Sequence, residues 1–160
     1  MQVRALAVAD LDCLLVVQEA GAVAGLSHIF PQDTHPFPRE VVRRRWLDEI
    51  EDPGVDAYVS IEEGQVNGFA ATRDCELLHF GTALDTWGTG LAKQLHDAVL
   101  ECFAQRLPTD TSHLRLRVFE ANLRARRFYE KLGWRLTGER SQTSFPPHPV
   151  LVEYHLPWHR

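Results

Sequence analysis

The sequence predicts an α+β fold in three layers, with a mixed sheet between two layers of helices. Residues 55–62 alternate apolar and polar residues, and two further strand-like segments follow them after short turns, up to residue 84, which predicts a meander of strands. Apolar residues at helical spacing come both before and after this meander. The chain has 160 residues, of which 44% are apolar, enough for one packed core. We therefore expect one domain over residues 1–160.

The first third of the chain predicts a strand, two helices and a long loop. Residues 3–8 suit a strand, and Asp10 is placed to cap a helix over residues 11–24. Residues 27–38, SHIFPQDTHPFP, hold three prolines and predict a loop. The next helix, residues 39–51, carries apolar residues every four positions. Its Arg43-Arg44-Arg45 run is expected to be a solvated face, with a contact to a phosphate as the alternative.

The remaining elements follow from the same two periodicities. The meander strands are expected at residues 55–62, 66–72 and 77–84. A helix at 89–105, a strand at 114–118 and a helix at 123–132 come next. Two last strands, 134–141 and 150–156, flank the proline-rich loop SFPPHP. The count is seven strands and about four helices.

Composition excludes some classes of function. There are 17 Lys and Arg against 22 Asp and Glu, a formal net charge of −5, which argues against a nucleic-acid partner and is compatible with a cationic amine. The three cysteines, Cys13, Cys75 and Cys102, have no CxxC spacing and fit a reduced cytoplasm. No run of 18 apolar residues and no signal peptide are visible, so we expect a cytoplasmic protein without a membrane partner.

A glycine-rich stretch lies between the third meander strand and the long helix. It reads Trp87-Gly88-Thr89-Gly90-Leu91-Ala92. Small residues at such a junction let backbone N–H groups converge at a helix N-terminus, where the dipole favours phosphate. A dinucleotide fingerprint would need Gly at position 93, which is Lys93, and no P-loop is present. A tight turn that merely needs glycine is the alternative.

A second motif decides between these interpretations. WGTGLA followed by NxxAxxFYxxxGW resembles the GNAT superfamily of acetyl-CoA-dependent N-acetyltransferases. The positions that match the two family motifs are Gly90, Ala92, Asn122, Ala125, Phe128, Tyr129 and Gly133. The resemblance implies a three-layer α/β/α fold, a mostly antiparallel sheet, acetyl-CoA as co-substrate and no metal. One departure is Trp87, which replaces a Gln or Arg and puts any side-chain contact at that position in doubt.

The resemblance also implies which residues bind the coenzyme. Backbone amides of the glycine-rich stretch would grip the pyrophosphate, and a splayed strand would present amides near Phe80 to Thr82 to the pantetheine arm and the thioester carbonyl. Asn122 would contact pantetheine, cap the following helix, or do both. The implied coenzyme-binding residues are Phe80, Thr82, Trp87, Gly88, Thr89, Gly90, Leu91, Ala92, Asn122, Ala125 and Phe128.

For catalysis the resemblance points to Tyr129 as the general acid that protonates the departing thiolate; packing on the sheet edge is its plain alternative. Deprotonating an amine of pKa about 10.4 at pH 7 costs about 4.6 kcal/mol, so a base is needed. Glu76 and His79, on the third meander strand, are the candidates. Alternation puts them on opposite faces of that strand unless a bulge intervenes.

The acceptor site is expected at the two proline-rich loops. Phe30, Phe37 and Phe145 would wall a pocket, and Asp33 would pair with a cationic amine. The grouping of His28, Asp33 and His35 also suggests a metal, but their spacing fixes no common face and no fourth ligand is evident. The loop as an ordered, proline-stiffened surface segment is the simpler interpretation.

The sequence and the resemblance thus predict an N-acetyltransferase that moves the acetyl group of acetyl-CoA by direct attack to the primary amine of a small-molecule acceptor. A nucleophilic role for Cys75 is disfavoured because no His-Cys pairing is visible. Two alternatives stay open: acetylation of a protein or peptide N-terminus or lysine, and a non-catalytic acyl-CoA-binding module. Edge strands and apolar loop residues are compatible with a homodimer.

Overall fold

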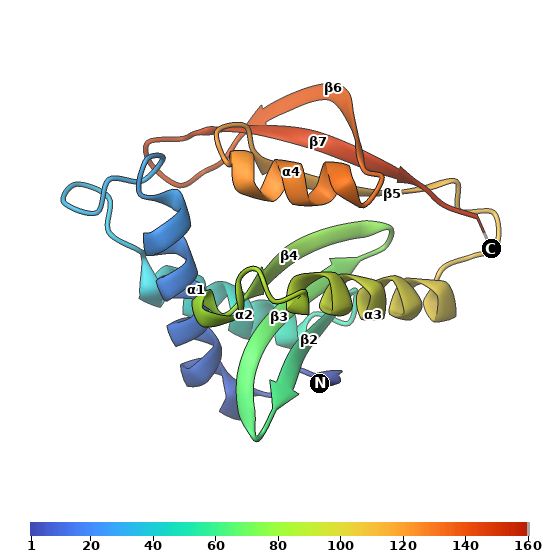
Figure 1. Ribbon diagram of the computed structural model, residues 1–160, viewed down its shortest axis with the longest axis horizontal. Helices are drawn as coiled ribbons and strands as arrows, with labels where there is room; N and C mark the ends of the chain where they lie inside the picture. The colour runs from blue at the N-terminus through green and yellow to red at the C-terminus, as the bar shows by residue number, and fades with distance from the viewer. Residues whose placement is uncertain (160) are drawn as a thin grey trace.

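The computed structural model describes residues 1–159 and contains a seven-stranded sheet with helices on both faces (Figure 1). The strands are β1 (Gln2–Ala5), β2 (Val55–Glu62), β3 (Gln65–Arg73), β4 (Glu76–Thr82), β5 (His113–Phe119), β6 (Arg135–Gln142) and β7 (Val150–Pro157). The helices are α1 (Leu11–Leu26), α2 (Arg39–Glu51), α3 (Leu91–Arg106) and α4 (Leu123–Lys131), with short 3₁₀ turns η1 (Val8–Asp10) and η2 (Leu84–Thr86). The predicted fold class is confirmed.

The sheet has the order β1-β2-β3-β4-β5-β7-β6 and is antiparallel except between β4 and β5. That one parallel pair has only two register positions, Glu76 with Arg115 and Leu77 with Leu116. Beyond Leu77 the two strands part, and Figure 1 shows β4 diverging from β5 and α4. The backbone of β4 therefore lacks a neighbouring strand on that side over most of its length.

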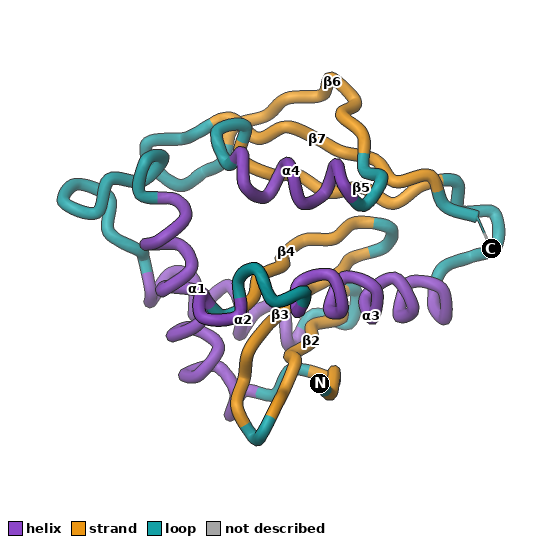
Figure 2. Tube along the Cα trace, in the orientation of Figure 1, coloured by secondary structure: helices purple, strands orange, loops and turns teal. Residues whose placement is uncertain are grey.

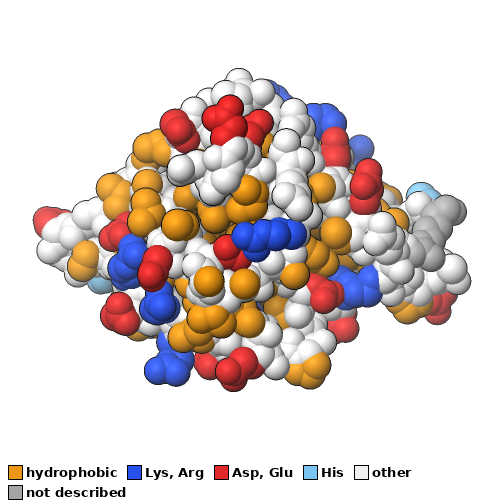
Figure 3. All heavy atoms as spheres, turned by 90° about the horizontal axis from the view of Figure 1, so that it is seen from below, with side chains coloured by type: hydrophobic (Ala, Val, Ile, Leu, Met, Phe, Trp, Pro, Cys, Tyr) orange, Lys and Arg blue, Asp and Glu red, His pale blue; other side chains and the backbone are white. Residues whose placement is uncertain are grey.

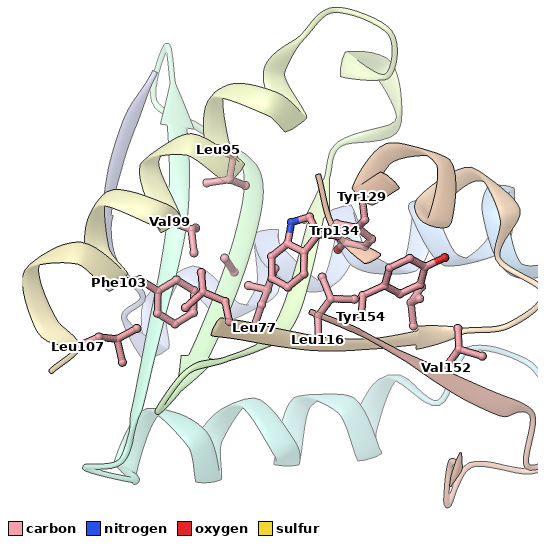
Figure 4. Close-up of a cluster of buried hydrophobic side chains, with 13 residues drawn as sticks. Leu77, Leu95, Val99, Phe103, Leu107, Leu116, Tyr129, Trp134, Val152 and Tyr154 are labelled. Carbon is pink, nitrogen blue, oxygen red and sulfur yellow. The ribbon is translucent and has the colours of Figure 1, made fainter. Parts of the chain in front are cut away.

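Two hydrophobic clusters hold the helices to the two faces of the sheet. Side chains of α1 and α2, among them Leu14 and Trp46, pack with Phe69 on one face. Side chains of α3 and α4, with Leu77 and Trp134, form the cluster on the other face (Figure 4). Figure 2, which colours the helices apart from the strands, shows α3 and α4 as separate rods. The site described below lies where these layers meet at the parting of β4 and β5.

The observed ends of the elements differ from the predicted ones mainly at the first strand. β1 ends at Ala5, and the chain makes the turn η1 where a strand to residue 8 was expected. Asp10 does not cap α1: its carboxylate accepts a hydrogen bond from the Ala7 N–H at 2.9 Å and pairs with Arg4 at 2.7 Å. Asp10 thus closes the 3₁₀ turn that leads into the helix.

A bulge in β4 changes which side chains share a face. His79 lies opposite Ala71 of β3 and Leu77 lies opposite Thr72, so Leu78 is an extra residue. Because the alternation shifts at the bulge, His79 faces the same side of the sheet as Glu76. The expectation that these two candidate bases point to opposite faces is wrong.

Among residues 1–159, no helix combines the length and apolar character needed to cross a membrane. The same part of the chain contains no group of three His, Cys, Asp or Glu side chains that could hold a metal ion. Figure 3 shows one face of the molecule, where acidic and basic side chains are interspersed with apolar ones. That face carries no extended field of one sign.

Candidate active site

The glycine-rich stretch forms the junction between η2 and α3. Gly88 and Gly90 adopt φ values of 83° and 90°, which favour glycine, and Gly90 is the N-cap of α3. The N–H groups of the first helical turn have no carbonyl partner further back in the helix. Within residues 1–159, only the N–H of Leu91 has a side-chain partner, a long contact of 3.4 Å to Thr89 Oγ1. These amides form a positive helix end suited to a phosphate.

Trp87 anchors this junction to two helices. Its indole Nε1–H donates to the Thr82 carbonyl at 3.1 Å, and its ring lies against α1 at Gly21 and Gly25. The guanidinium carbon of Arg124, at the start of α4, lies 3.4 Å from the centre of the indole ring. Trp87 is therefore a packing residue between α1 and α4, which explains how a Trp can stand at this position.

The start of α4 approaches the parting strands from the other side. Asn122 is the N-cap, and its side-chain oxygen accepts from the Ala125 N–H at 3.2 Å. No hydrogen bond within residues 1–159 occupies the side-chain NH₂ of Asn122. Phe128 of α4 stacks on Phe80 of β4, with ring centres 5.8 Å apart. α4 and β4 thus meet through aromatic rings beside a free amide donor.

Tyr129 is the buried residue of α4. Its ring lies within 6.3 Å of the Phe80 ring, 5.3 Å of the Phe128 ring and 6.0 Å of the Trp134 ring. Figure 4 shows Tyr129 beside Trp134 at the edge of the cluster. No hydrogen bond within the described chain involves its hydroxyl, and burial alone raises the pKa of the phenol above its ordinary value. Tyr129 is a neutral donor without a protein partner.

Glu76 lies on the same face of β4 as His79, but its carboxylate is already engaged. Arg115 NH2 donates to one oxygen at 2.7 Å and Arg117 Nε donates to the other at 3.0 Å. Glu76 is only 7% exposed. Its carboxylate ties β4 to β5 within the short stretch where the two strands pair.

His79 lies just past that point and forms a pair with Glu49 of α2. The distances from His79 Nε2 to the two Glu49 carboxylate oxygens are 2.8 and 2.9 Å, and the imidazole packs edge-on against Trp46 at 5.0 Å. Since a carboxylate only accepts, Nε2 carries the hydrogen and Nδ1 keeps a lone pair. Burial lowers the pKa of His79 below 6.5, with Glu49 opposing the shift. The imidazole is neutral at pH 7.

The loop between α1 and α2 packs against the end of β5. Phe30 meets Phe119 edge-on at 5.3 Å, and His28 Nε2 lies 2.8 Å from the Ala121 carbonyl. Phe37 is partly buried against the α1–α2 cluster. Asp33, also in this loop, is exposed, and the loop projects from the body of the molecule in Figure 1. Two of the three predicted wall residues are thus used in packing.

Comparisons with known proteins agree with this geometry. The model described as acetyltransferase (GNAT) family matches residues 13–134, which contain both motifs. The chain belongs to this GNAT family. Membership of this family makes the protein an enzyme, an acetyltransferase. The search of curated proteins found no match.

Solved structures share the fold of this GNAT chain at low sequence identity. PaiA N-acetyltransferase of Thermoplasma acidophilum, solved in complex with coenzyme A, gives a TM-score of 0.71 at 14% identity over 98% of each chain. Ribosomal-protein-S18-alanine N-acetyltransferase of Escherichia coli gives 0.70 at 18% identity, over 99% of this chain and 94% of that one. A spermidine N-acetyltransferase mutant from Vibrio cholerae gives 0.70 at 16% identity, over 98% and 95%.

The GNAT site contains two residues that the sequence interpretation missed. Glu49 follows Trp46 by three positions and so lies beside it on the inward face of α2, which is a signal that the helical spacing offered. Arg124 follows Asn122 in the second motif, but nothing local predicts that it stacks on Trp87. The structure brings together the predicted residues of β4, the glycine-rich stretch and α4, and it leaves Asp33 apart.

Proposed function

We propose that this GNAT domain transfers the acetyl group of acetyl-CoA to a primary amine by direct attack, without a covalent enzyme intermediate. The observation that carries the proposal is Tyr129, a buried residue whose hydroxyl has no hydrogen-bond partner within residues 1–159 and whose ring lies against Phe80, beside the parting of β4 and β5. The glycine-rich stretch, which suits a phosphate, ends in the helix on the same side of the sheet as Tyr129.

The coenzyme-binding part of the proposal rests on free hydrogen-bonding groups. The first-turn amides of α3, from Leu91 onward, would hold the pyrophosphate with the help of the helix dipole. The edge of β4 beyond Leu77 lacks a paired strand and would bind the pantetheine arm in a strand-like manner. The side-chain NH₂ of Asn122, between the end of β5 and the start of α4, would be a further hydrogen-bond donor to the pantetheine arm.

The proposed reaction is a direct acyl transfer from sulfur to nitrogen. The amine nitrogen attacks the thioester carbonyl carbon, the C–S bond breaks, and the sulfur leaves with the electron pair. Tyr129 donates a hydrogen bond to this thiolate, the conjugate base of a thiol of pKa about 8.5, and shares its proton with it; the proton that the amine gives up finally restores the one that Tyr129 supplied, so that the products are the amide and the free thiol. Aromatic rings around Tyr129 exclude water, which strengthens that interaction.

His79 is the better of the two candidate bases. Glu76 offers no free oxygen, since two arginines occupy its carboxylate. The imidazole of His79 is neutral, lies at the parting of the strands and is oriented by Glu49. It would take the proton that the attacking amine loses, and Glu49 would stabilise the resulting imidazolium.

We propose a small-molecule acceptor. The contacts of His28 with Ala121 and of Phe30 with Phe119 fasten the α1–α2 loop across one side of the acceptor region, which hinders the passage of an extended peptide. Acetylation of a protein N-terminus or lysine is the second candidate, and one fold neighbour is named for a ribosomal-protein alanine.

The test is a Tyr129→Phe substitution. We expect turnover to fall by about tenfold or more, because the acid is removed, while acetyl-CoA affinity is retained. Thiol release and calorimetric titration with acetyl-CoA measure the two quantities. Unchanged turnover would remove Tyr129 from the mechanism. A parent protein that binds acetyl-CoA but acetylates none of a panel of amines, amino acids and short peptides would favour the binding module.

A further inference from the structure

We infer that the amine acceptor also carries a carboxylate, and that Arg45 binds it. The inference rests on the proposed acetyl transfer and deepens it by naming the class of acceptor. Arg45 lies on α2, one helical turn before Glu49, and so belongs to the same helix face as the partner of His79.

Among the arginines of α2, Arg45 combines partial burial with the lack of an ion-pair or hydrogen-bond partner within residues 1–159. Arg39 pairs with Glu19 at 3.2 Å, and Arg43 pairs with Asp12 at 2.6 Å. Arg44 is exposed. Arg45 is partly buried, its Nε has no hydrogen-bond partner, and no ion pair within the described chain involves its guanidinium. The expectation that the whole arginine run is a solvated face is therefore wrong for Arg45.

An unpaired, partly buried cation is unfavourable, because burial removes water without supplying another partner. Burial lowers the pKa of Arg45, and the carboxylate whose charge opposes this shift is that of Glu49. Both oxygens of Glu49 are within hydrogen-bond distance of His79 Nε2. A ligand carboxylate would supply the missing partner, and the planar guanidinium suits it in a two-bonded arrangement.

The surroundings place Arg45 in the acceptor region. Arg45 lies one helical turn before Glu49, whose carboxylate contacts His79 Nε2, and the charge of Arg45 contributes to lowering the pKa of His79. Its guanidinium carbon lies 5.9 Å from the centre of the Phe145 ring, in the β6–β7 loop that the sequence assigned to the acceptor. An acceptor with its amine at His79 and its carboxylate at Arg45 meets a neutral proton acceptor at one end and an opposite charge at the other.

The same arrangement disfavours a second cation on the acceptor. A polyamine that reached His79 would bring another ammonium close to Arg45, and like charges in a partly buried site repel. Asp33, the residue expected to attract such a cation, lies exposed on the projecting loop. The charges on α2 therefore favour an amino acid over a polyamine.

The experiment uses acceptors matched in shape. L-phenylalanine, L-phenylalaninamide and phenethylamine form one set, and L-leucine, L-leucinamide and 3-methylbutylamine form a second. In each set we expect kcat/KM to be at least about tenfold higher for the amino acid than for its amide or for the amine without a carboxylate, because one charge-assisted pair contributes about that much. Arg45→Gln should remove this preference. Arg44→Gln, the same change at the exposed neighbour, should leave it intact, and Arg45→Lys should be intermediate.

Three outcomes would overturn the inference. The first is equal turnover within a set by the parent protein, and the second is a preference that survives Arg45→Gln when acetyl-CoA affinity and thermal unfolding show the variant to be folded. In both cases the proposed acetyl transfer stands. If no amine is acetylated, calorimetry of N-acetyl-L-phenylalanine with the coenzyme-A-loaded protein decides. Binding by the parent protein that is lost in Arg45→Gln would support the carboxylate site. The third contradicting outcome is that the parent protein does not bind this compound.

Discussion

At the scale of single residues, the pairing of His79 with Glu49 predicts a pH profile. His79 accepts the amine proton only when neutral, and burial holds its pKa below 6.5, so kcat/KM should be lost on acidification only below that pH. Glu49 opposes this shift, as does the backbone of Leu78 to a smaller extent. Glu49→Gln should therefore move the acid inflection to lower pH and reduce kcat/KM at pH 7.5 by about tenfold or more.

The matched control for that change is Glu51→Gln, an exposed carboxylate on the same helix. It removes the same charge without touching His79, and its profile should match that of the parent. A Glu49→Gln profile that overlays the parent's would mean that His79 does not act as the base. The readout is the pH dependence of kcat/KM, measured with an amine whose own titration is recorded in parallel.

A second buried imidazole, His96, makes a stability prediction. Its Nε2 accepts the indole N–H of Trp134 at 3.0 Å inside the α3–α4 cluster. His96→Leu would leave that buried donor unsatisfied and should lower the free energy of unfolding by about 1–3 kcal/mol. His96→Gln, whose amide oxygen can accept, should cost less. Urea unfolding at pH 7.5 measures both, and equal stability of the two variants would contradict the argument.

The same residue sets a pH dependence of stability. Burial lowers the pKa of His96 below its ordinary 6.5, so the unfolded chain binds more protons than the folded one in that range. The free energy of unfolding should be level above about pH 6.5 and fall as the pH drops from there through the folded pKa. In His96→Gln the free energy of unfolding should fall less over this pH range, because only the titration of His79 would still contribute to the fall. An unchanged slope between pH 7 and 5.5 would show that His96 does not titrate in this way.

At the scale of elements, α1 and the glycine-rich junction meet through Trp87. A Cβ added at Gly25 would lie 3.3 Å from the indole, whereas one at Gly21 would lie at 3.7 Å, an ordinary contact. Gly21→Ala should stabilise the protein by about 0.5–1 kcal/mol through helix propensity. Gly25→Leu should destabilise it by about 1–3 kcal/mol and weaken acetyl-CoA binding, because the displaced Trp87 carries the junction with it. Thermal unfolding and acetyl-CoA titration give the comparison, and a tolerated Gly25→Leu would refute this role for Trp87.

Elements with a strong period are the part of the structure that the sequence predicts well. The stripe of Val42, Trp46 and Ile50 predicts α2 within its observed bounds. The bulge at Leu78 leaves no local signal, because it depends on how β4 pairs with β3, and it moves His79 to the face of Glu76. The burial of Arg45 likewise depends on a loop about a hundred residues away in the sequence, which no helical period encodes. Local patterns predict the elements, and the site is made by contacts between them.

At the scale of the whole molecule, the sheet consists of two parts joined by one short parallel pair. The part from β1 to β4 and the part from β5 to β7 share a ladder of only two register positions. The backbone of β4 after Leu77 therefore has an unpaired side, and unpaired amides exchange their hydrogens readily. A bound pantetheine arm would take the place of a neighbouring strand there.

This arrangement predicts where acetyl-CoA will slow amide hydrogen exchange. Protection should increase over residues 78–82, along the free edge of β4, and over residues 88–93, where the first-turn amides would hold the pyrophosphate. The β1–β2 pair, with a continuous ladder of its own, should not change beyond the general stabilisation that any ligand gives. S-acetylpantetheine, which lacks the pyrophosphate, should protect residues 78–82 and leave residues 88–93 as they are. Protection by acetyl-CoA confined to β6 and β7 would place the coenzyme elsewhere and would overturn the assignment of the β4 edge.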